Sequence, residues 1–484
     1  MAEMHPEYEI VIGLEVHAQL QTESKLFCGD PASFGAAPNT HVSPITLGHP
    51  GTLPMLNRKA IEYAIRMGLV CHCEIERFNY FARKNYFYPD LPKGYQVSQH
   101  TTPICKNGYV TIHSGGAIKK IPLTRIHLEE DAGKSIHDVA DEYTCLDYNR
   151  AGVPLIEIVS EPDMRSADEA FAFLSEIRKL VRWIGVCDGN MEEGSLRCDA
   201  NISVRVKGDH QLGTKVEVKN LNSIRNVKKA IEVESARLIG MLQKGEIIMQ
   251  ETRSFNADND TTFSIRTKED ADDYRYFPEP DLTPFSCTDE YINSIEKSLP
   301  ELPEKLIERY TQSFGLSAYD AGVLSDSKEL STYFESICAV TDHYKAAANW
   351  LSGPVKSWLN ENGKEWEDVQ IKPQTWAALF SMVESGSLGF SLAAQKVLPV
   401  LLEGEVEDPL ALAKQMNLLQ DAGKTDIQNW VDAVLEKMPD KVQEYRKGKK
   451  GLIGLFVGEV KKISRGKADP KITNELLLEK LNQS

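Results

Sequence analysis

Apolar and polar side chains alternate along several segments of the first 290 residues, which is the pattern of half-buried β-strands. In residues 11–20, one face of the predicted strand carries Ile12, Leu14, Val16, Ala18 and Leu20, and the other carries Gly13, Glu15, His17 and Gln19. Residues 198–206 and 214–219 alternate in the same way, with polar rows that contain Asp199, Asn201, Glu217 and Lys219. If these strands share one sheet, its polar face forms a platform. Taken singly, each row is equally the exposed side of a strand.

The pattern becomes helical after a proline-marked passage between Pro278 and Pro303. Apolar residues then recur with the helix period in 304–314, 327–340 and 344–360. An acidic stretch with Gly and Pro, 403–409, looks like a second joint, and short amphipathic helices follow it. In the first part of the chain, the pair Gly115-Gly116 lies between two apolar runs and predicts a β-hairpin.

Charge is distributed unevenly along the 484 residues, whose net charge is −16. Residues 441–467 contain nine Lys or Arg and two Glu, a local balance of +7 that leaves −23 for the rest. A basic end on an acidic body favours a local contact with a polyanion, although a solvated lysine-rich loop explains it as well. Nine cysteines, an odd number, indicate a reducing compartment. With no apolar run long enough for a membrane span and no signal-peptide pattern, we expect a cytoplasmic protein.

Glu157 is the most informative single residue because its same-face neighbours, Leu155 and Val159, are apolar. A buried carboxylate must be protonated, paired with a cation such as Arg, or bound to a metal ion. Three further acids follow one another in residues 129–131. The Gly-Lys-Ser at 133–135 is no phosphate loop, because Leu128 stands where that motif requires Gly. The acids suit Mg²⁺, which takes a few carboxylates together with water and nucleotide oxygens.

Arg83 and Lys84 could balance the charge of a phosphate, or could be solvated charges beside the aromatic residues that follow them. The chain has no Gly-x-Ser-x-Gly elbow and no glycine-rich dinucleotide fingerprint. The residues by themselves therefore indicate an enzyme that uses a divalent metal and a nucleotide.

Five motifs closely resemble those of B subunits of tRNA-dependent amidotransferases, the GatB family, and the likeness runs almost from end to end. They are Val11-Ile12-Gly13-Leu14-Glu15-Val16-His17, Arg83-Lys84-Asn85-Tyr86-Phe87-Tyr88-Pro89-Asp90, Leu128-Glu129-Glu130-Asp131-Ala132-Gly133-Lys134, the stretch from Glu192 to Asn201 and the stretch from Asp273 to Asp281.

The resemblance implies an α+β fold: a cradle domain with a mixed or antiparallel β-sheet at 1–293, an all-α helical domain at 294–404 and a small YqeY-like helical tail at 405–484. It implies that the chain uses ATP and Mg²⁺ to phosphorylate the esterified side-chain carboxylate of misacylated Glu-tRNA(Gln) or Asp-tRNA(Asn). Ammonia from a glutaminase, the A subunit, then displaces the phosphate, and a small C subunit would complete a heterotrimer. The tail would contact the tRNA.

Carried over residue by residue, the resemblance assigns the metal to His17, Glu130 and Glu157, with Glu15 beside them. It leaves open whether Glu129 or Glu130 is the direct ligand. Arg83 and Lys84 would bind the nucleotide, with Lys84 facing phosphate. Asp199 and Asn201, together with Lys219, would line the reaction site.

The chain departs from the family at one metal site. Some members hold zinc with a Cys-x-Cys and a later Cys-x-x-Cys, but the matching residues here are Cys28, Asp30, Ser43 and Thr46. Because three of the four thiols are missing, we expect no zinc. The competing hypothesis for the whole chain is a non-catalytic RNA-binding scaffold that retains the fold. Which of the two tRNA substrates is used is left open.

Overall fold

The structure, a computed structural model, describes all residues except 1–6, 138, 140–141, 268–273, 405, 420–423, 465, 467 and 483–484. Asp273 of the fifth motif, Glu405 of the second joint, and Arg465 and Lys467 of the basic tail therefore lie outside the described residues. The chain divides into two units, Met1–Pro300 and Glu301–Ser484.

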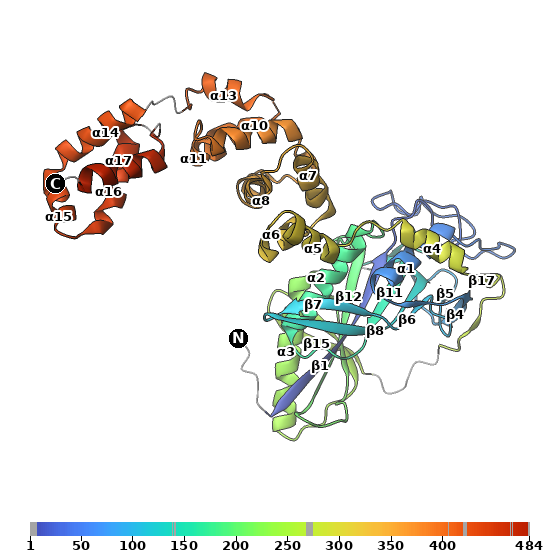
Figure 1. The fold of residues 1–484 in the computed structure, drawn as a ribbon. Helices are drawn as coiled ribbons and strands as arrows, with labels where there is room; N and C mark the ends of the chain where they lie inside the picture. The colour runs from blue at the N-terminus through green and yellow to red at the C-terminus, as the bar shows by residue number, and fades with distance from the viewer. Residues whose placement is uncertain are drawn as a thin grey trace. The chain divides into compact units, whose positions relative to one another are not determined.

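A large mixed sheet organises the first unit (Figure 1). Its thirteen strands, counted over the described residues, follow a main path in the order β15-β14-β13-β12-β1-β11-β8-β5-β4-β16, with β2, β6 and β7 paired beside it. Along this path only β13 and β14 are parallel. The strands are β1 (Tyr8–Gln19), β2 (Glu74–Ile75), β3 (Phe78–Asn79), β4 (Ala82–Asn85), β5 (Tyr95–Ser98), β6 (Cys105–Lys106), β7 (Tyr109–Ser114), β8 (Ala117–Glu130), β9 (Lys134–Ile136), β10 (Cys145–Asp147), β11 (Pro154–Ser160), β12 (Leu196–Val206), β13 (Val216–Lys219), β14 (Glu251–Asn256), β15 (Thr261–Thr267), β16 (Phe277–Pro278) and β17 (Phe285–Ser286). The mixed sheet that the sequence predicted is confirmed.

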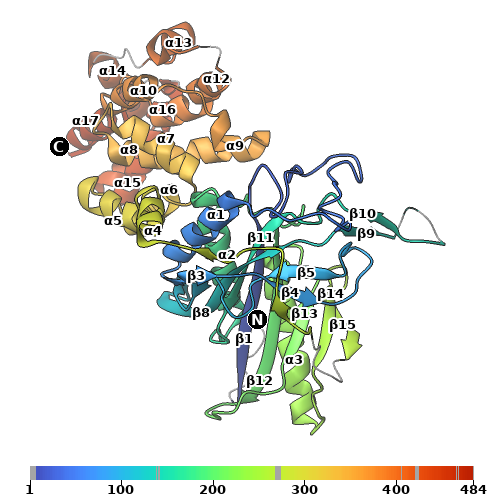
Figure 2. The same ribbon diagram turned by 90° about the vertical axis from the view of Figure 1, so that its right-hand side faces the viewer.

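Helices α1 (Arg58–Val70), α2 (Ala167–Trp183) and α3 (Ile224–Gln243) pack against one face of this sheet (Figures 1 and 2). The hydroxyl of Ser166 caps the N-terminus of α2, and that of Ser223 caps α3, each by accepting a backbone N–H of the first turn. Residues 289–297 form α4 (Asp289–Lys297). The apolar sides of the central strands meet these helices, so the opposite, polar side of the strands stays open.

The alternation read from the sequence is confirmed in the strands that carry the polar rows. The apolar row of residues 12–20 is exposed by no more than 3%, whereas Glu15 and His17 are partly exposed. The predicted hairpin is confirmed too: Gly115 and Gly116 join β7 to β8 with φ of 58° and 80°. Both central residues of such a two-residue turn need positive φ, which glycine adopts without strain.

The second unit is helical. Its elements are α5 (Pro303–Ser313), α6 (Ala318–Leu324), α7 (Lys328–Cys338), α8 (Tyr344–Trp350), α9 (Lys356–Asn362), α10 (Pro373–Glu384), α11 (Phe390–Leu392), α12 (Leu398–Leu402), α13 (Pro409–Gln415), α14 (Lys424–Lys437), α15 (Pro439–Arg446), α16 (Ile453–Ile463) and α17 (Pro470–Asn482). The stretch predicted as one helix at 344–360 is α8 and α9 joined by a π-helical turn, Leu351–Val355. Pro354 lies inside this turn and has no N–H for the α-helical hydrogen bond. None of the described helices has both the length and the apolar composition that a membrane crossing requires.

The last four helices, α14 to α17, have an apolar core of their own. Its members include Val431, Phe456, Val460 and Leu477, all of them fully buried. Helix α13 instead packs against α10. The domain boundary that we placed at residue 405 stays a prediction.

We predict that Ile156→Ala, in the middle of β11, lowers the free energy of unfolding by about 2–5 kcal/mol, because the side chain is fully buried and the cavity it leaves closes only in part. Chemical denaturation followed by far-UV circular dichroism measures the loss. Ile118→Ala is the matched control, because Ile118 is 70% exposed, and it should change the value by about 0.5 kcal/mol or less. Equal effects of the two substitutions would contradict the assignment of Ile156 to the core.

Candidate metal centre

A row of three side chains crosses the open face of the sheet. His17 on β1 lies directly opposite Glu157 on β11, which in turn lies opposite His127 on β8. The Oε2 atom of Glu157 is 3.6 Å from Nε2 of His17 and 3.3 Å from Nε2 of His127. The Glu157 side chain is only 12% exposed. A carboxylate is thus held between two imidazoles by strand register alone.

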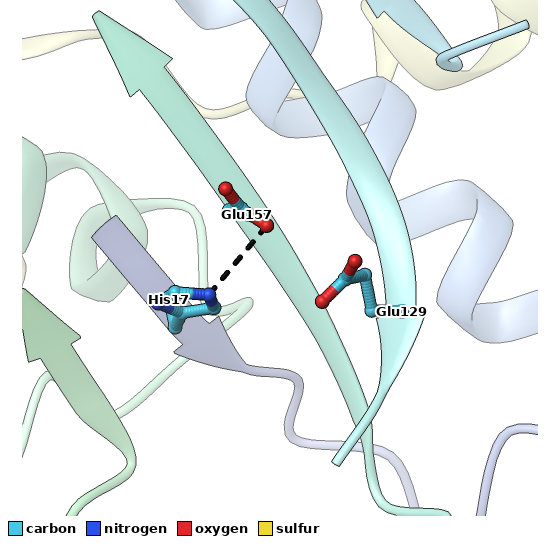
Figure 3. A group of neighbouring side chains, drawn as sticks. All are labelled: His17, Glu129 and Glu157. Atoms are coloured by element: carbon cyan, nitrogen blue, oxygen red, sulfur yellow. Dashed lines mark ion pairs between the residues drawn. The ribbon is translucent and has the colours of Figure 1, made fainter. Parts of the chain in front are cut away.

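Glu129 completes the group from the same face of β8, two residues after His127 (Figure 3). Its carboxylate accepts hydrogen bonds from Ser98 Oγ at 2.7 Å and Gln96 Nε2 at 3.0 Å, and lies 3.1 Å from His127 Nε2. One ligand atom from each of His17, Glu129 and Glu157 lies within 4.8 Å of the others. Figure 3 shows the three side chains gathered over neighbouring strands.

The charges of this group are strongly coupled. Burial by itself would raise the pKa of Glu157, but the positive charges of His127 and His17 outweigh it and hold that pKa well below its ordinary value. Burial opposes protonation of His17, yet the hydrogen bond and charge of Glu157 raise the pKa of its imidazole. Without an added ion, Glu157 is therefore ionised and paired with histidine rather than with arginine.

One imidazole and two carboxylates fit a divalent cation. Carboxylate oxygens are the ligands that Mg²⁺ prefers, and a protein that supplies only three ligand atoms leaves positions for water and phosphate oxygens. Mn²⁺ accepts the same mixture of oxygen and imidazole. The two carboxylates would also lose their mutual repulsion on binding such an ion.

A second polar group follows on β1, β12 and β13. Asp199 lies opposite Glu15, and Asn201 lies opposite Glu217. Asn201 Nδ2 donates to Glu15 Oε1 at 2.9 Å. Lys219 Nζ lies 2.6 Å from Asp199 and 3.1 Å from Glu217, so an ammonium already balances these acids.

The protonation of this second group follows from its surroundings. Burial raises the pKa of Glu15, and the negative charge of nearby Glu157 adds to the effect. Burial would lower the pKa of Lys219, but Asp199 and Glu217 raise it, so the ammonium stays charged. We call His17, Glu129 and Glu157 the metal group. The structure brings the predicted residues Glu15, Asp199, Asn201 and Lys219 together beside it.

Two predicted residues lie on the opposite side of the sheet. Glu130 Oε1 lies 2.5 Å from Lys93 Nζ and accepts the backbone N–H of Val97 at 2.8 Å. Arg83 donates to Glu279 at 2.7 Å. Neither Glu130 nor Arg83 lies with His17, because neighbouring residues of a strand point to opposite faces. The assignment of Glu130 to the metal and of Arg83 to the nucleotide stays a prediction.

Glu130 belongs to a separate cavity of about 230 Å³. Glu130 and Lys93 line it together with the partner of Arg83, Glu279. The loop with Thr46 and His49 forms another part of its wall. The cavity and the metal group thus share strand β8 but not its face.

Lys84 lies on the same face of the sheet as Glu129, because it is opposite Gln96 on β5. Its Nζ atom is 5.0 Å from the ring centre of Tyr274 and 5.7 Å from that of Tyr86. Burial would lower the pKa of Lys84, but the nearby carboxylates of Glu129 and Glu157 raise it. A charged ammonium therefore lies near the carboxylates of Glu129 and Glu157.

His127 and the donors that hold Glu129 were not predicted from the sequence. The missing signal was the alternation of residues 125–129, in which Ile126 and Leu128 are buried between polar residues. That pattern extends β8 into the acidic motif. It therefore places Glu129 and Glu130 on opposite faces of the sheet. Gln96 and Ser98 carry no local signal, because only the pairing of β5 with β8 brings them to Glu129.

The four residues at the family's zinc positions are joined by hydrogen bonds. Asp30 Oδ2 accepts from Thr46 Oγ1 at 2.5 Å and from the backbone N–H of Ser43 at 2.8 Å. Cys28 Sγ lies 3.4 Å from Thr46 Oγ1. One thiol, one carboxylate and two hydroxyls do not fit a structural zinc site, which uses four Cys or His ligands. The absence of zinc stays a prediction.

Comparison with known proteins places these residues in a family context. The family described as the GatB/GatE catalytic domain matches residues 10–293, and the GatB domain matches residues 332–481. The B subunit of the aspartyl/glutamyl-tRNA(Asn/Gln) amidotransferase from Thermodesulfovibrio yellowstonii is 47% identical over 477 residues, which cover 99% of this chain and all of that protein. Proteins of the same name from Thermoanaerobacter sp. strain X514 and from Geotalea uraniireducens are each 48% identical, covering 98% of this chain and 100% and 99% of their own lengths.

The two adjacent glutamates of β8 provide a matched test of the metal group. We predict that Glu129→Gln weakens binding of Mn²⁺ by about tenfold or more, because even residues that only orient metal ligands contribute this much. Glu130→Gln, one residue away on the other face, should leave Mn²⁺ affinity unchanged. Titration followed by electron paramagnetic resonance measures both constants. The reverse order of effects would restore Glu130 as the ligand.

Proposed function

This chain belongs to the GatB family, and from that membership we propose that it is the activating subunit of a tRNA-dependent amidotransferase. Its substrates would be misacylated Glu-tRNA(Gln), Asp-tRNA(Asn) or both, which become Gln-tRNA(Gln) and Asn-tRNA(Asn). The observation that carries the proposal is the ionised, nearly buried carboxylate of Glu157 beside His17 and Glu129. Such a group is suited to hold a cation against phosphate oxygens.

The reaction divides into two steps. The free side-chain carboxylate of the glutamyl or aspartyl group, which is esterified to the tRNA through its α-carboxyl, attacks the γ-phosphorus of ATP, and ADP leaves, so that an acyl phosphate forms. Ammonia then attacks the acyl carbon, inorganic phosphate leaves, and the nitrogen loses a proton to give the amide. Phosphoryl transfer of this kind requires positioning and charge neutralisation more than a nucleophilic side chain.

Each group on the open face has a role in this scheme. His17, Glu129 and Glu157 would hold Mg²⁺, which neutralises phosphate charge when it is bound. The ammonium of Lys84 approaches the same phosphates from β4. Asn201 orients Glu15 through its 2.9 Å hydrogen bond, and Asp199 holds Lys219, so that this second group lines the place of the acyl end.

The scheme requires other protein chains. Because we identified no glutaminase nucleophile in the sequence, ammonia would come from an amidase, the A subunit, and a small C subunit would complete a cytoplasmic heterotrimer. The curated relatives are named as B subunits, which supports a complex of several chains. A scaffold without catalytic activity is the alternative, but a scaffold gains nothing from keeping an ionised Glu157 at a cost in desolvation.

Activity with both substrates tests the proposal. In the reconstituted complex with ammonia as donor, we predict that Glu157→Gln reduces ATP-dependent amidation by roughly two orders of magnitude, the scale on which electrostatic groups of active sites contribute. Glu308→Gln, a substitution on α5, is the control for charge alone. Wild-type complex that cleaves no ATP in the presence of either misacylated tRNA would favour the scaffold, and an active Glu157→Gln complex would remove the metal role.

The basic tail supplies the proposed tRNA contact. Helix α16 lies within this basic stretch and buries Phe456 and Val460. Lys449 and Lys450 precede it, while Lys461 and Lys462 lie exposed in its last turn. The four lysines therefore flank one short helix, where one nucleic-acid backbone could meet them all.

We predict that replacing these four lysines by Gln weakens aminoacyl-tRNA binding and flattens its dependence on salt by about 0.7–0.9 in log–log slope for each phosphate that is no longer neutralised. ATP affinity should not change, because the tail shares no residue with the metal group. Filter binding over a range of KCl concentrations measures the slope. The matched control replaces four exposed lysines elsewhere: Lys207, Lys244, Lys297 and Lys305. Identical slopes for the two variants would reduce the tail to a solvated surface.

A further inference from the structure

Arg125 continues the polar row of β8, two residues before His127 and on the same face. Its Nε atom is buried and has no hydrogen-bond partner among the described residues. No ion pair found among those residues includes Arg125. Two other arginines of the same sheet do have acidic partners: Arg197 is paired with Asp131 at 2.7 Å, and Arg83 with Glu279 at 2.7 Å.

An arginine without an acidic partner, partly removed from water, is costly unless an anion completes it. This desolvation cost is specific to arginine at this position, since a lysine could extend its ammonium to water and a glutamine carries no charge. The planar guanidinium presents paired N–H groups that match two oxygens of one phosphate. Arg125 therefore has the properties of a phosphate ligand that lacks its phosphate.

An aromatic pair lies at the β4–β5 end of the same sheet: His100 follows β5, whose Ser98 is opposite Glu129 of β8, and Tyr276 precedes β16, which pairs with β4. The rings of His100 and Tyr276 are parallel within 6°, with their centres 3.9 Å apart, and His100 is exposed. Burial lowers the pKa of His100, and the charges of Arg125 and His127 lower it further. The pKa of Tyr276 also responds to Lys84 and Arg125. The charge of Arg125 thus acts on both rings, and an imidazole stacked on a phenol leaves an aromatic surface that suits a nucleobase.

We propose that Arg125 and the His100–Tyr276 stack form a nucleotide subsite at the edge of the metal group, with Arg125 on phosphate and the stack on adenine. This inference rests on the proposed function and adds residues to it. The same chemistry has two sources in that reaction, since ATP and the 3′-terminal adenosine of the tRNA both join an adenine to phosphate. Lys84 and Arg125 would approach the phosphates from two sides, opposite the carboxylates that hold the cation.

Separate probes for phosphate and base test the two halves of the subsite in the reconstituted complex with Mg²⁺. Arg125→Gln should weaken both ATP and inorganic tripolyphosphate on the order of tenfold to a hundredfold, the range of a charge-assisted hydrogen bond. His100→Ala should weaken ATP on the order of tenfold and leave tripolyphosphate unchanged, because stacking acts only on the base. Isothermal titration calorimetry measures all four constants.

Three further measurements make the result unambiguous. Arg125→Lys retains the charge without the fork, so an intermediate loss in a variant with an unchanged unfolding midpoint excludes misfolding as the cause. Arg77→Gln is the matched control, because Arg77 is half exposed and its ion pair is with exposed Asp289. A minihelix of the tRNA acceptor stem, with and without its 3′-terminal adenosine, is titrated with the same variants.

Losses in the ATP arm assign the subsite to ATP, and losses confined to the minihelix assign it to the 3′ end. Full affinity of Arg125→Gln and His100→Ala for all three ligands overturns the subsite. That failure is distinct from failure of the proposed function, in which the wild-type complex itself would neither bind ATP nor amidate the tRNA.

Discussion

The rest of the open face depends on one interaction, the ionised carboxylate of Glu157 held between the imidazoles of His17 and His127. An unpaired carboxylate at this depth would cost several kcal/mol. The two imidazoles offset that cost only while β1, β11 and β8 keep their register, since each partner comes from a different strand. Helices α1 and α2 pack behind these strands and hold them in place. The pairing of Glu157 on the open face therefore depends on the same strand register that the packing of the core maintains.

Strand β8 shows how strictly that register must be kept. A slip of one residue would exchange the two faces of a strand. Here it would put Glu130 among the metal ligands and Glu129 into the cavity with Lys93. Both glutamates are fixed against this exchange: Glu129 by Ser98 and Gln96, and Glu130 by the backbone N–H of Val97. Strand β5 supplies the partners on both faces, so a short strand of four residues determines the function of a long one.

Local patterns in the sequence predicted what is local in the structure. The alternation in residues 11–20 predicted β1 and its polar row, Gly115-Gly116 predicted the hairpin, and the helical periods predicted α5 and α7. What the sequence left open depended on the length of β8: the hairpin predicted its first half, but not its continuation to Glu130, and without that continuation Glu130 was as good a candidate ligand as Glu129. Strand order is also beyond local reading. The sequence near Glu157 does not indicate that its partners are His17 and His127, because tertiary packing brings these strands together.

The distribution of charge on the open face bears on the proposal that an acidic protein of net charge −16 binds polyanions. Screening at physiological salt limits the reach of a charge to about 8 Å, so local groups decide binding and the net charge does not. On the β12–β13 side, the cations Arg197 and Lys219 are already balanced by Asp131 and Asp199. On the β4–β8 side, Lys84 and Arg125 have no such ion pair among the described residues.

Unbalanced positive charge is therefore concentrated next to the carboxylates of Glu129 and Glu157, which supply negative charge for a cation. A ligand that carries both a divalent cation and phosphate satisfies the two sides at once, whereas neither the free cation nor the free polyphosphate does. The divalent cation and the polyphosphate should consequently bind cooperatively on this face. The cation would be held by the carboxylates and would in turn bind the phosphate oxygens that Lys84 and Arg125 approach.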